Sequence, residues 1–365
     1  MEPLHNPIYL TVAFKQAGET ALSDRGMDLK YSREENPTVR ELEHRLASLE
    51  GGVDAIALNS GMAAISLLYV STLSAGDEVL LPMEGYGTTI QLAEELSKFG
   101  VRVKLVYPSA DSLVDAMGEG TKLVLVETIT NPTLKVIDVE KVVKRAREVG
   151  ATVIVDNTFS PLVFRPLKLG AHGVVHSLTK YIAGHNDVLG GALVWGALEG
   201  EELWHWRRRL GSIIQPLDAW LTIRGVKTLE LRFERQSKNA LAIAEFLSEH
   251  PKVKAVHYPG LRDDEYHGIA RKLFERPLFG GVVSFRHAGG KNGAKDFLCS
   301  LRRVFPSPSL GGVESLASYP IISAAKTMPS ERRELLGITA DLIRLSVGIE
   351  DLDTLIEDLD RALGG

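Results

Sequence analysis

Short apolar segments alternate with helix-like segments along the first half of the chain, and this alternation constrains the fold more than any other feature. Each apolar segment is rich in β-branched residues and is bounded by glycine or polar residues, as buried strands of a parallel sheet are. The strand candidates are residues 55–58, 77–82, 101–107, 123–126, 152–155 and 173–175. The segment 139–149 carries valine and alanine at helical spacing between Asp138 and Gly150, which are typical helix ends. We therefore predict an α/β fold with a mainly parallel sheet that helices cover on both faces.

The pattern changes near residue 226, and the change predicts a second, smaller domain. A long helical segment covers residues 226–250, and residues 280–285 and 343–347 follow as strand candidates. A chain of 365 residues is long enough for two packed regions. We expect an N-terminal arm and first helix in residues 1–45, a large domain in 46–225 and an α+β domain in 226–365. The arm has little periodicity up to about Met27, which suits a segment that lies on a partner subunit.

An acid, two hydroxyls and an amine follow two neighbouring strand candidates. Asp156 directly follows one strand, and Ser177, Thr179 and Lys180 follow the next. Ligands of open α/β sheets bind at the carboxyl ends of the strands, so these side chains are expected to share one crevice. The set fits pyridoxal phosphate, which needs a lysine for its Schiff base, an acid for its ring nitrogen and hydroxyls for its phosphate. We predict that the chain binds this cofactor.

Both charged residues also have simpler interpretations. A lysine near a strand end is usually a solvated surface charge, and Asp156 could cap the loop at Asn157 and Thr158. Two arguments favour a catalytic role for these residues over the simpler interpretations. An amine among apolar neighbours and other cations has a lowered pKa and becomes a nucleophile. A buried carboxylate needs a cationic partner, which a protonated ring nitrogen supplies. We therefore assign catalytic roles to Lys180 and Asp156.

Other candidates depend on their context. Gly61 and Met62 open a helix after Ser60, so their N–H groups could bind a phosphate, although any serine N-cap looks the same. Tyr86 follows a strand candidate and is placed to stack on a ring, or it is an ordinary loop tyrosine. Arg344 lies within an apolar strand candidate and needs an anion, for which a substrate carboxylate would serve.

Charge and composition exclude several partners. A net charge of −5 gives no reason to expect a nucleic acid or an acidic membrane as a partner. No apolar stretch approaches the length of a membrane span and no signal peptide follows Met1, so we expect a cytoplasmic location. Trp204 and Trp206 beside residues 207–209, three arginines, indicate a helix with aromatic anchors and a solvated basic face.

Cysteine and histidine usage indicates neither a disulfide nor a metal site. Cys299 is the single cysteine, which fits a reducing compartment, and its apolar neighbours predict a buried thiol. His172 and His176 lie four residues apart in one strand candidate and would face the same side. A metal site there is conceivable, but packed and hydrogen-bonded imidazoles are more common, and we expect no metal.

Ordered motifs along nearly the whole chain resemble one family, the pyridoxal-phosphate enzymes of cysteine and methionine metabolism. Its members include cystathionine γ-synthases, γ-lyases and β-lyases, methionine γ-lyases and homoserine-ester sulfhydrylases. The motifs are residues 6–11, 31–38, 60–65, 155–159, 176–191, 216–221, 224–229, 309–316 and 344–348. The resemblance implies the aspartate-aminotransferase-like fold (fold type I), with an arm, a large cofactor domain and a small C-terminal domain.

The resemblance also implies a role for each matching residue. Lys180 would hold the cofactor and move protons, and Asp156 would pair with its ring nitrogen. Tyr86 would stack on the ring and take part in proton transfer. The implied phosphate-binding residues of the same subunit are Gly61, Met62, Ser177 and Thr179. Tyr31 and Arg33 are implied to reach the phosphate of a neighbouring subunit, in a dimer or a tetramer of dimers. The implied substrate-carboxylate residues are Asn131, Ser309 and Arg344.

Three departures from the family pattern bear on the substrate. Gln91 stands where members that handle cystathionine often carry arginine, and Thr88 stands where methionine γ-lyases often carry cysteine. Ala324 and Ala325 replace a frequent Thr-His pair. A neutral glutamine offers no cation to the distal end of cystathionine, so we expect weak selection for it, unless Gln91 faces away from the substrate.

The implied reaction is replacement or elimination at the γ-carbon of a homoserine-ester or cystathionine-type amino acid. Methionine γ-lyase, cystathionine β-lyase and homoserine-ester sulfhydrylase activities are the alternatives. A Rossmann-like oxidoreductase would share the alternation but needs a Gly-x-Gly-x-x-Gly turn, and residues 60–64 read Ser-Gly-Met-Ala-Ala. A binding protein without activity would not need Lys180 together with Asp156.

Overall fold

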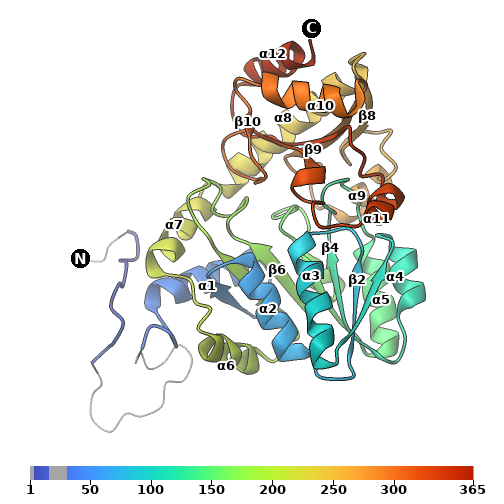
Figure 1. Ribbon diagram of the computed structural model, residues 1–365. Coiled ribbons are helices and arrows are strands. Elements are labelled where there is room, and N and C mark those ends of the chain that lie inside the picture. The colour runs from blue at the N-terminus through green and yellow to red at the C-terminus, as the bar shows by residue number, and fades with distance from the viewer. Residues whose placement is uncertain (1–3, 16–30, 365) are drawn as a thin grey trace.

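The computed structural model describes residues 4–15 and 31–364, which form a seven-stranded and a five-stranded sheet (Figure 1). The large sheet has the order β1-β7-β6-β5-β4-β2-β3. Its strands are β1 (Asp54–Leu58), β2 (Glu78–Pro82), β3 (Arg102–Val106), β4 (Thr121–Glu127), β5 (Thr152–Asp156), β6 (Gly173–Ser177) and β7 (Gly191–Trp195). Strands β2 to β6 pair in parallel, whereas β7 runs antiparallel between β1 and β6. The predicted mainly parallel sheet is confirmed, although β7 was not among the strand candidates.

Helices cover both faces of the large sheet because its strands are apolar on both sides. Alternate residues such as Ala55 and Ile56 belong to two separate buried clusters. The helices of this part are α1 (Pro37–Glu50), α2 (Gly61–Thr72), α3 (Gly87–Glu95), α4 (Ala110–Ala116), α5 (Val139–Val149) and α6 (Gly200–Leu210). Apolar residues of α1, α4 and α5 join one cluster, and those of α2, α3 and α6 join the other.

Local signals set the helix ends as expected. The Asn36 side chain accepts hydrogen bonds from the N–H groups of Thr38 and Val39, and Pro37 fills the first helical position of α1. Asp138 caps α5, which ends at Gly150 in the left-handed region (φ 73°). These caps fix where each helix begins relative to the strand before it. Ser60 likewise caps α2, so the N-terminus of this helix lies where β1 ends, at the carboxyl edge of the sheet.

The C-terminal part is a smaller α+β unit, as predicted. Its sheet has the order β10-β11-β12-β9-β8. The strands are β8 (Val253–His257), β9 (Val282–His287), β10 (Phe305–Pro306), β11 (Leu316–Ser318) and β12 (Leu342–Ser346). The helices after α6 are α7 (Pro216–Val226), α8 (Leu229–Glu249), α9 (His267–Leu273), α10 (Gly290–Ser300), α11 (Ser330–Leu336) and α12 (Leu352–Leu363). The helix expected over residues 226–250 is thus α8, and α7 precedes it.

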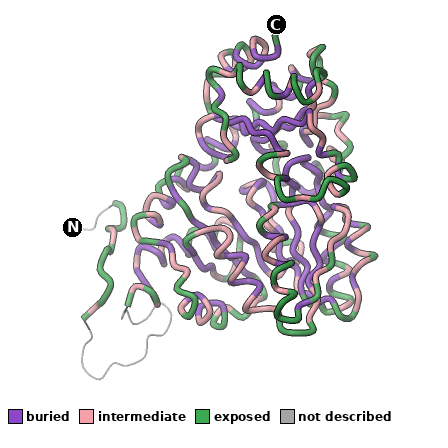
Figure 2. The backbone as a smooth tube through the Cα atoms, viewed as in Figure 1, coloured by how far each residue is buried: buried purple, intermediate pink, exposed green. Residues whose placement is uncertain are grey.

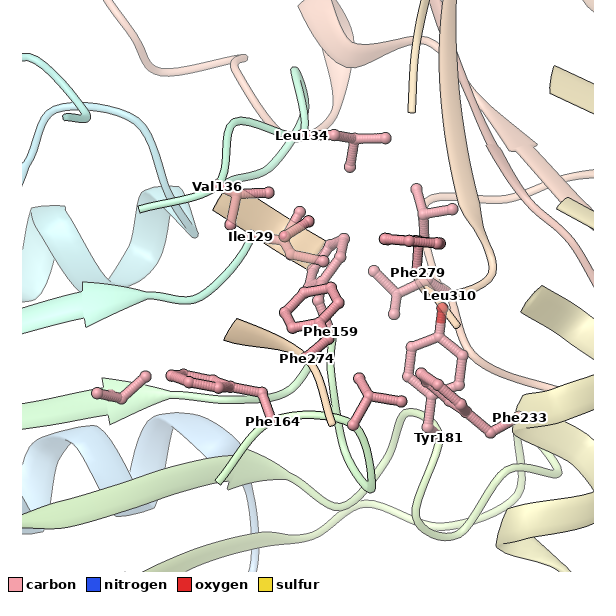
Figure 3. Close-up of a cluster of buried hydrophobic side chains, with 14 of the residues drawn as sticks. Ile129, Leu134, Val136, Phe159, Phe164, Tyr181, Phe233, Phe274, Phe279 and Leu310 are labelled. Carbon is pink, nitrogen blue, oxygen red and sulfur yellow. The ribbon is translucent and has the colours of Figure 1, made fainter. Parts of the chain in front are cut away.

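One apolar core joins the two parts. Figure 2 shows buried backbone running through both sheets, and Figure 3 shows the aromatic cluster near their junction. The Tyr181 and Phe233 rings meet edge to face with centroids 5.2 Å apart, and Phe164 and Phe274 lie 6.2 Å apart. This packing seats the C-terminal unit over the carboxyl edge of the large sheet.

Two side-chain expectations are wrong. Cys299 is exposed, because Ala294 and Phe297 are the residues of α10 that face the core and Cys299 lies on another side of the helix. Arg207 is only 2% exposed, because it turns inward from α6 and its Nη1 lies 2.6 Å from Glu43 Oε1. Residues 1–3 and 16–30 of the expected arm lie outside the described residues. Within the described ranges, no helix is both long and apolar enough to span a bilayer.

Candidate active site

A cavity lies at the carboxyl ends of β4, β5 and β6, between the large sheet and the C-terminal unit. The sequence-predicted residues that line it are Gly61, Met62, Tyr86, Asn131, Asp156, Ser177, Thr179, Lys180 and Arg344. The first and the last of them, Gly61 and Arg344, lie 283 residues apart in the chain. The fold therefore brings together the candidates that strand-end reasoning placed in one crevice.

Lys180 lines this cavity and is held there by a hydrogen bond. The chain turns after β6, and the Lys180 amine donates a hydrogen bond to Ser309 Oγ at 3.0 Å. Burial, and secondly the positive charge of Arg344, lower the pKa of Lys180 to about 8. A lysine with this pKa has a substantial neutral fraction near physiological pH. It can therefore act as a nucleophile and as a proton carrier.

Asp156 ends β5 and points into the same cavity. Burial raises the pKa of its carboxyl, and hydrogen bonds from Thr158 oppose this effect. The Thr158 N–H donates to Asp156 Oδ1 at 3.0 Å, while Thr158 Oγ1 accepts from the Ser177 N–H at 2.9 Å. Thr158 thus ties the ends of β5 and β6 together. A protonated ring nitrogen placed here would supply the cation that a desolvated carboxylate requires.

The other end of the cavity has the features of an anion site. Ser60 caps α2 by accepting a hydrogen bond from the Ala63 N–H at 3.0 Å. Helix α2 is 12 residues long, and its N-terminal residues Gly61 and Met62 line the cavity with Ser177 and Thr179. A Cβ atom at residue 61 would lie 3.1 Å from Ser177 Cβ, so glycine allows the two segments to approach. Free N–H groups, a helix N-terminus and two hydroxyls fit a phosphate.

Arg344, on β12 of the C-terminal unit, also lines the cavity. It is 3% exposed, and burial lowers its pKa to about 10. Its Nη1 donates to Asn131 Oδ1 at 2.9 Å, and its Nη2 donates to the carbonyl oxygens of Pro308 (2.8 Å) and Ser309 (3.0 Å). Its Nε has no hydrogen-bond partner among the described residues. A buried guanidinium held by neutral acceptors needs an anion, and a substrate carboxylate fits this need.

Tyr31 and Arg33 are not brought into this cavity. Both are exposed and border a separate hollow with residues 213–216. The Arg33 guanidinium lies 5.3 Å from the centroid of the Tyr31 ring, and its Nη1 donates to the Arg208 carbonyl at 3.2 Å. Lys180 and Arg344 are the cations that line the cavity among the described residues. The phosphate end consequently has no cation from the described part of its own chain.

The residues that depart from the family pattern do not line the cavity either. Thr88 is exposed and Gln91 is half-buried, whereas Thr89 between them reaches the cavity wall. On α3, Gln91 is rotated by about 200° from Thr89, since each residue turns the helix by about 100°. Ala324 lies close to the start of α3, because a Cβ atom added at Gly87 would be 3.4 Å from the Ala324 carbonyl oxygen.

The two histidines considered as metal ligands do not act as a pair. His176 Nε2 lies 2.6 Å from Glu50 Oε1, and both side chains are buried. His172 precedes β6, and its Nδ1 accepts a hydrogen bond from the Val153 N–H at 3.1 Å. No cluster of three or more His, Cys, Asp or Glu side chains able to hold a metal occurs among the described residues.

Sequence reasoning missed several residues of the site. The cavity is also lined by Ser60, the expected N-cap, and by residues that were not assigned to the site: Ile65, Thr89, Glu127, Thr158, Phe159, Leu189, Pro308 and Leu310. Glu127 could have been found, because it follows the strand candidate 123–126 just as Asp156 follows 152–155. Pro308 and Leu310 carry no comparable signal, since the packing of the C-terminal unit places them. Ser309 is not among the lining residues and takes part through its hydrogen bond with Lys180.

Comparisons with known proteins agree with this geometry. Residues 1–364 match the family described as "Cys/Met metabolism PLP-dependent enzyme", where PLP is pyridoxal phosphate. A cystathionine gamma-synthase of Mycobacterium tuberculosis is 44% identical over 363 residues, which cover 98% of this chain and 91% of that protein. A cystathionine beta-lyase of Lactococcus lactis is 41% identical over 361 residues, covering 98% and 93%.

The fold is also similar to solved structures. Cystathionine gamma synthase from Xanthomonas oryzae, solved with aminoacrylate and cysteine, is 38% identical with a TM-score of 0.93. The alignment covers 98% of this chain and 92% of that one. The prediction of the fold-type-I architecture is therefore confirmed, as are the predicted cofactor and the family resemblance. The chain belongs to the pyridoxal-phosphate-dependent enzymes of cysteine and methionine metabolism.

Proposed function

We propose that this enzyme catalyses replacement or elimination at the γ-carbon of homoserine-ester or cystathionine-type amino acids. The observation that carries the proposal is the placement of Lys180 and Arg344 in one cavity, with Lys180 Nζ 3.0 Å from Ser309 Oγ. A carboxylate bound at Arg344 places an amino acid beside the amine that moves its protons. The choice of the γ-carbon rests on the relative named cystathionine gamma-synthase.

The chain's residues would divide the chemistry as follows. Pyridoxal phosphate, when bound, supplies an aldehyde for amines and a ring that withdraws electrons from the substrate α-carbon. Lys180 Nζ would take the α-proton and deliver it elsewhere, which its pKa of about 8 permits near neutral pH. Asp156 would bind the ring nitrogen, and Ser177 and Thr179 would bind phosphate oxygens. Tyr86, half exposed at the cavity wall, would cover the ring and assist in proton transfer.

Product analysis distinguishes this reaction from its alternatives. The enzyme is incubated with a homoserine ester plus cysteine, with cystathionine and with methionine, in separate reactions. γ-Replacement forms cystathionine from the first mixture. γ-Elimination of cystathionine releases cysteine, ammonia and 2-oxobutanoate, whereas β-elimination releases homocysteine, ammonia and pyruvate. Products of β-elimination alone, or no product in any mixture, would contradict the proposal.

We further propose that two copies of the chain share each active site, within a dimer or a tetramer of dimers. Arg33 is exposed and lies outside the cavity of its own chain, while the phosphate end of that cavity lacks a cation from the described residues. Arg33 of a second copy would supply that charge, with Tyr31 beside it. A cytoplasmic location and the domain limits 1–45, 46–225 and 226–365 also remain proposals.

A further inference from the structure

Two acidic side chains end neighbouring strands at the floor of the cavity. Glu127 is the last residue of β4 and Asp156 is the last residue of β5, and the two are paired in register in a parallel ladder. Residues paired in this way send their side chains to the same face of the sheet. Both line the cavity that contains Lys180. The mechanism above uses Asp156 and leaves Glu127 without a role.

One oxygen of Glu127 holds the backbone at Tyr86. The Tyr86 N–H donates to Glu127 Oε1 at 2.5 Å. The chain wraps closely around this carboxyl, because a Cβ atom at Gly85 would lie 2.8 Å from the same oxygen. The Tyr86 carbonyl accepts the Thr89 N–H at 2.9 Å, so Glu127 supplies the hydrogen bond on the N–H side, while the Tyr86 side chain is 50% accessible. The position of Tyr86 over the cavity therefore depends on the Glu127 carboxyl.

The other oxygen of Glu127 is sealed from solvent. Glu127 Oε2 has no hydrogen-bond partner among the described residues. Burial, and next the charges of Asp156 and Glu84, raise the pKa of Glu127 well above its usual range, which the Tyr86 N–H only partly opposes. Glu84 itself is paired with Lys135 at 2.8 Å. Lys180 and Arg344 are the positive groups that line the cavity in the described part of the chain.

Two adjacent carboxyls in such a place keep one proton between them, because two buried like charges repel. Asp156 accepts the Thr158 N–H and would also face a cationic ring nitrogen, and both interactions favour its charged form. Glu127 is left with the proton. A protonated carboxyl accepts the Tyr86 N–H at Oε1 and carries its O–H at Oε2.

We propose that Glu127 is a positioning residue of the cofactor site: one oxygen fixes Tyr86, and the other carries the single proton of a carboxyl pair with Asp156. The inference rests on the proposed function, since that function makes Asp156 the partner of the cofactor. Asp156 thereby stays ionised while its neighbour remains neutral. Glutamine has the shape and hydrogen-bonding pattern of a protonated glutamate, so it should replace Glu127 with little loss.

The test compares Glu127→Gln with Glu127→Leu and Gly85→Ala in the full chain. Cofactor dissociation constants are measured by equilibrium dialysis, and kcat and KM are measured on cystathionine. We expect E127Q to bind the cofactor within about threefold of the unmodified enzyme, and E127L to bind at least about tenfold more weakly, the effect of one lost buried hydrogen bond. G85A should also weaken binding, because its Cβ displaces the carboxyl without removing it. Glu119→Gln, at an exposed residue just before β4, is the matched control and should change nothing.

Infrared difference spectroscopy supplies a second readout. The unmodified protein should show a protonated-carboxyl band that disappears in E127Q. A band that E127Q leaves unchanged would overturn the proposal, as would equal losses of cofactor affinity in E127Q and E127L, since Glu127 would then act through its charge. Failure of the unmodified chain to bind pyridoxal phosphate would instead refute the proposed function, and the infrared band would still report on Glu127.

Discussion

Lys135 Nζ lies 2.8 Å from Glu84 Oε2, and this buried ion pair fastens the loop between β4 and α5 to both parts of the molecule. Glu84 follows β2, and its Oε1 accepts the Thr133 N–H at 2.8 Å. Lys135 also donates to the Leu336 carbonyl of the C-terminal unit at 3.0 Å. Asn131, which binds Arg344, lies in the loop between these contacts. The pair therefore positions the candidate carboxylate site without touching it.

Glu84→Gln should destabilise the protein, because the buried Lys135 ammonium loses its counter-charge. We expect the free energy of unfolding to fall by about 3–5 kcal/mol. The double variant Glu84→Leu with Lys135→Met should lose less, since no charge is left buried. Urea unfolding measures both values. Asp111→Asn, in the exposed pair of Lys141 and Asp111, is the control and should change stability by less than about 1 kcal/mol. Equal effects at the buried and exposed pairs would contradict this account.

Lys180→Ala should abolish turnover and leave the chain folded. The amine is nucleophile and proton carrier at once, and its loss should cost at least several orders of magnitude in rate. Among the described residues its side chain makes one hydrogen bond, to Ser309, so far-ultraviolet circular dichroism should be unchanged. A variant with substantial activity would show that Lys180 does not have this role.

Cofactor uptake should depend on pH through Lys180. Only the neutral amine attacks an aldehyde, and the pKa of Lys180 is lowered from 10.5 to about 8. The rate at which cofactor-free protein takes up pyridoxal phosphate should therefore rise with pH and level off above about 8. Arg344→Met removes the neighbouring positive charge and should raise the pH at which the rate levels off. Stopped-flow absorbance measures the rate, and a rise that continues to pH 10 in the unmodified protein would exclude the lowered pKa.

Arg33→Ala should weaken cofactor binding more than folding. Loss of a charged phosphate contact should cost about 2 kcal/mol of binding free energy, measured by equilibrium dialysis. Arg145→Ala on α5, which removes an exposed ion pair with Glu148, is the matched control. An unchanged cofactor affinity in Arg33→Ala would exclude the role.

Mixing Lys180→Ala with Arg33→Ala, at a cofactor concentration that loads the unmodified enzyme and leaves Arg33→Ala largely unloaded, tests whether Arg33 acts across subunits. In a hybrid of Lys180→Ala and Arg33→Ala subunits, one of the two sites combines an intact Lys180 with an intact Arg33. Random pairing should restore about a quarter of the unmodified activity, because half of the dimers are hybrids with one intact site each. No recovery after verified subunit exchange would show that Arg33 does not act on the site of the neighbouring subunit.

The sequence predicted what local rules control. Strand ends located Asp156 and Lys180, and helix-start signals located Gly61. It did not predict which way a charged side chain turns when tertiary packing decides, as for Arg207, which pairs with Glu43 inside the molecule. Nor did it reveal the cavity residues Pro308 and Leu310, because the packing of two units distant in sequence places them. The strand-end rule could also have predicted Glu127, which follows a strand candidate as Asp156 does. It was missed because the residues after Glu127 carry no hydroxyl-and-lysine pattern like that after β6.

Arg344→Lys should impair recognition of the substrate carboxylate specifically. The guanidinium is held by Asn131 and two backbone carbonyls, and its Nε is free of partners among the described residues. Lysine is a point charge that cannot bind Asn131 and an anion at the same time, as a forked guanidinium can. Substrate binding should therefore weaken by about 2–4 kcal/mol, which is measured as a higher KM. The informative comparison uses an amino-acid inhibitor and its decarboxylated amine. The unmodified enzyme should bind the amino acid far more tightly, and Arg344→Lys should lose most of that preference. If the preference persists, the carboxylate is bound elsewhere.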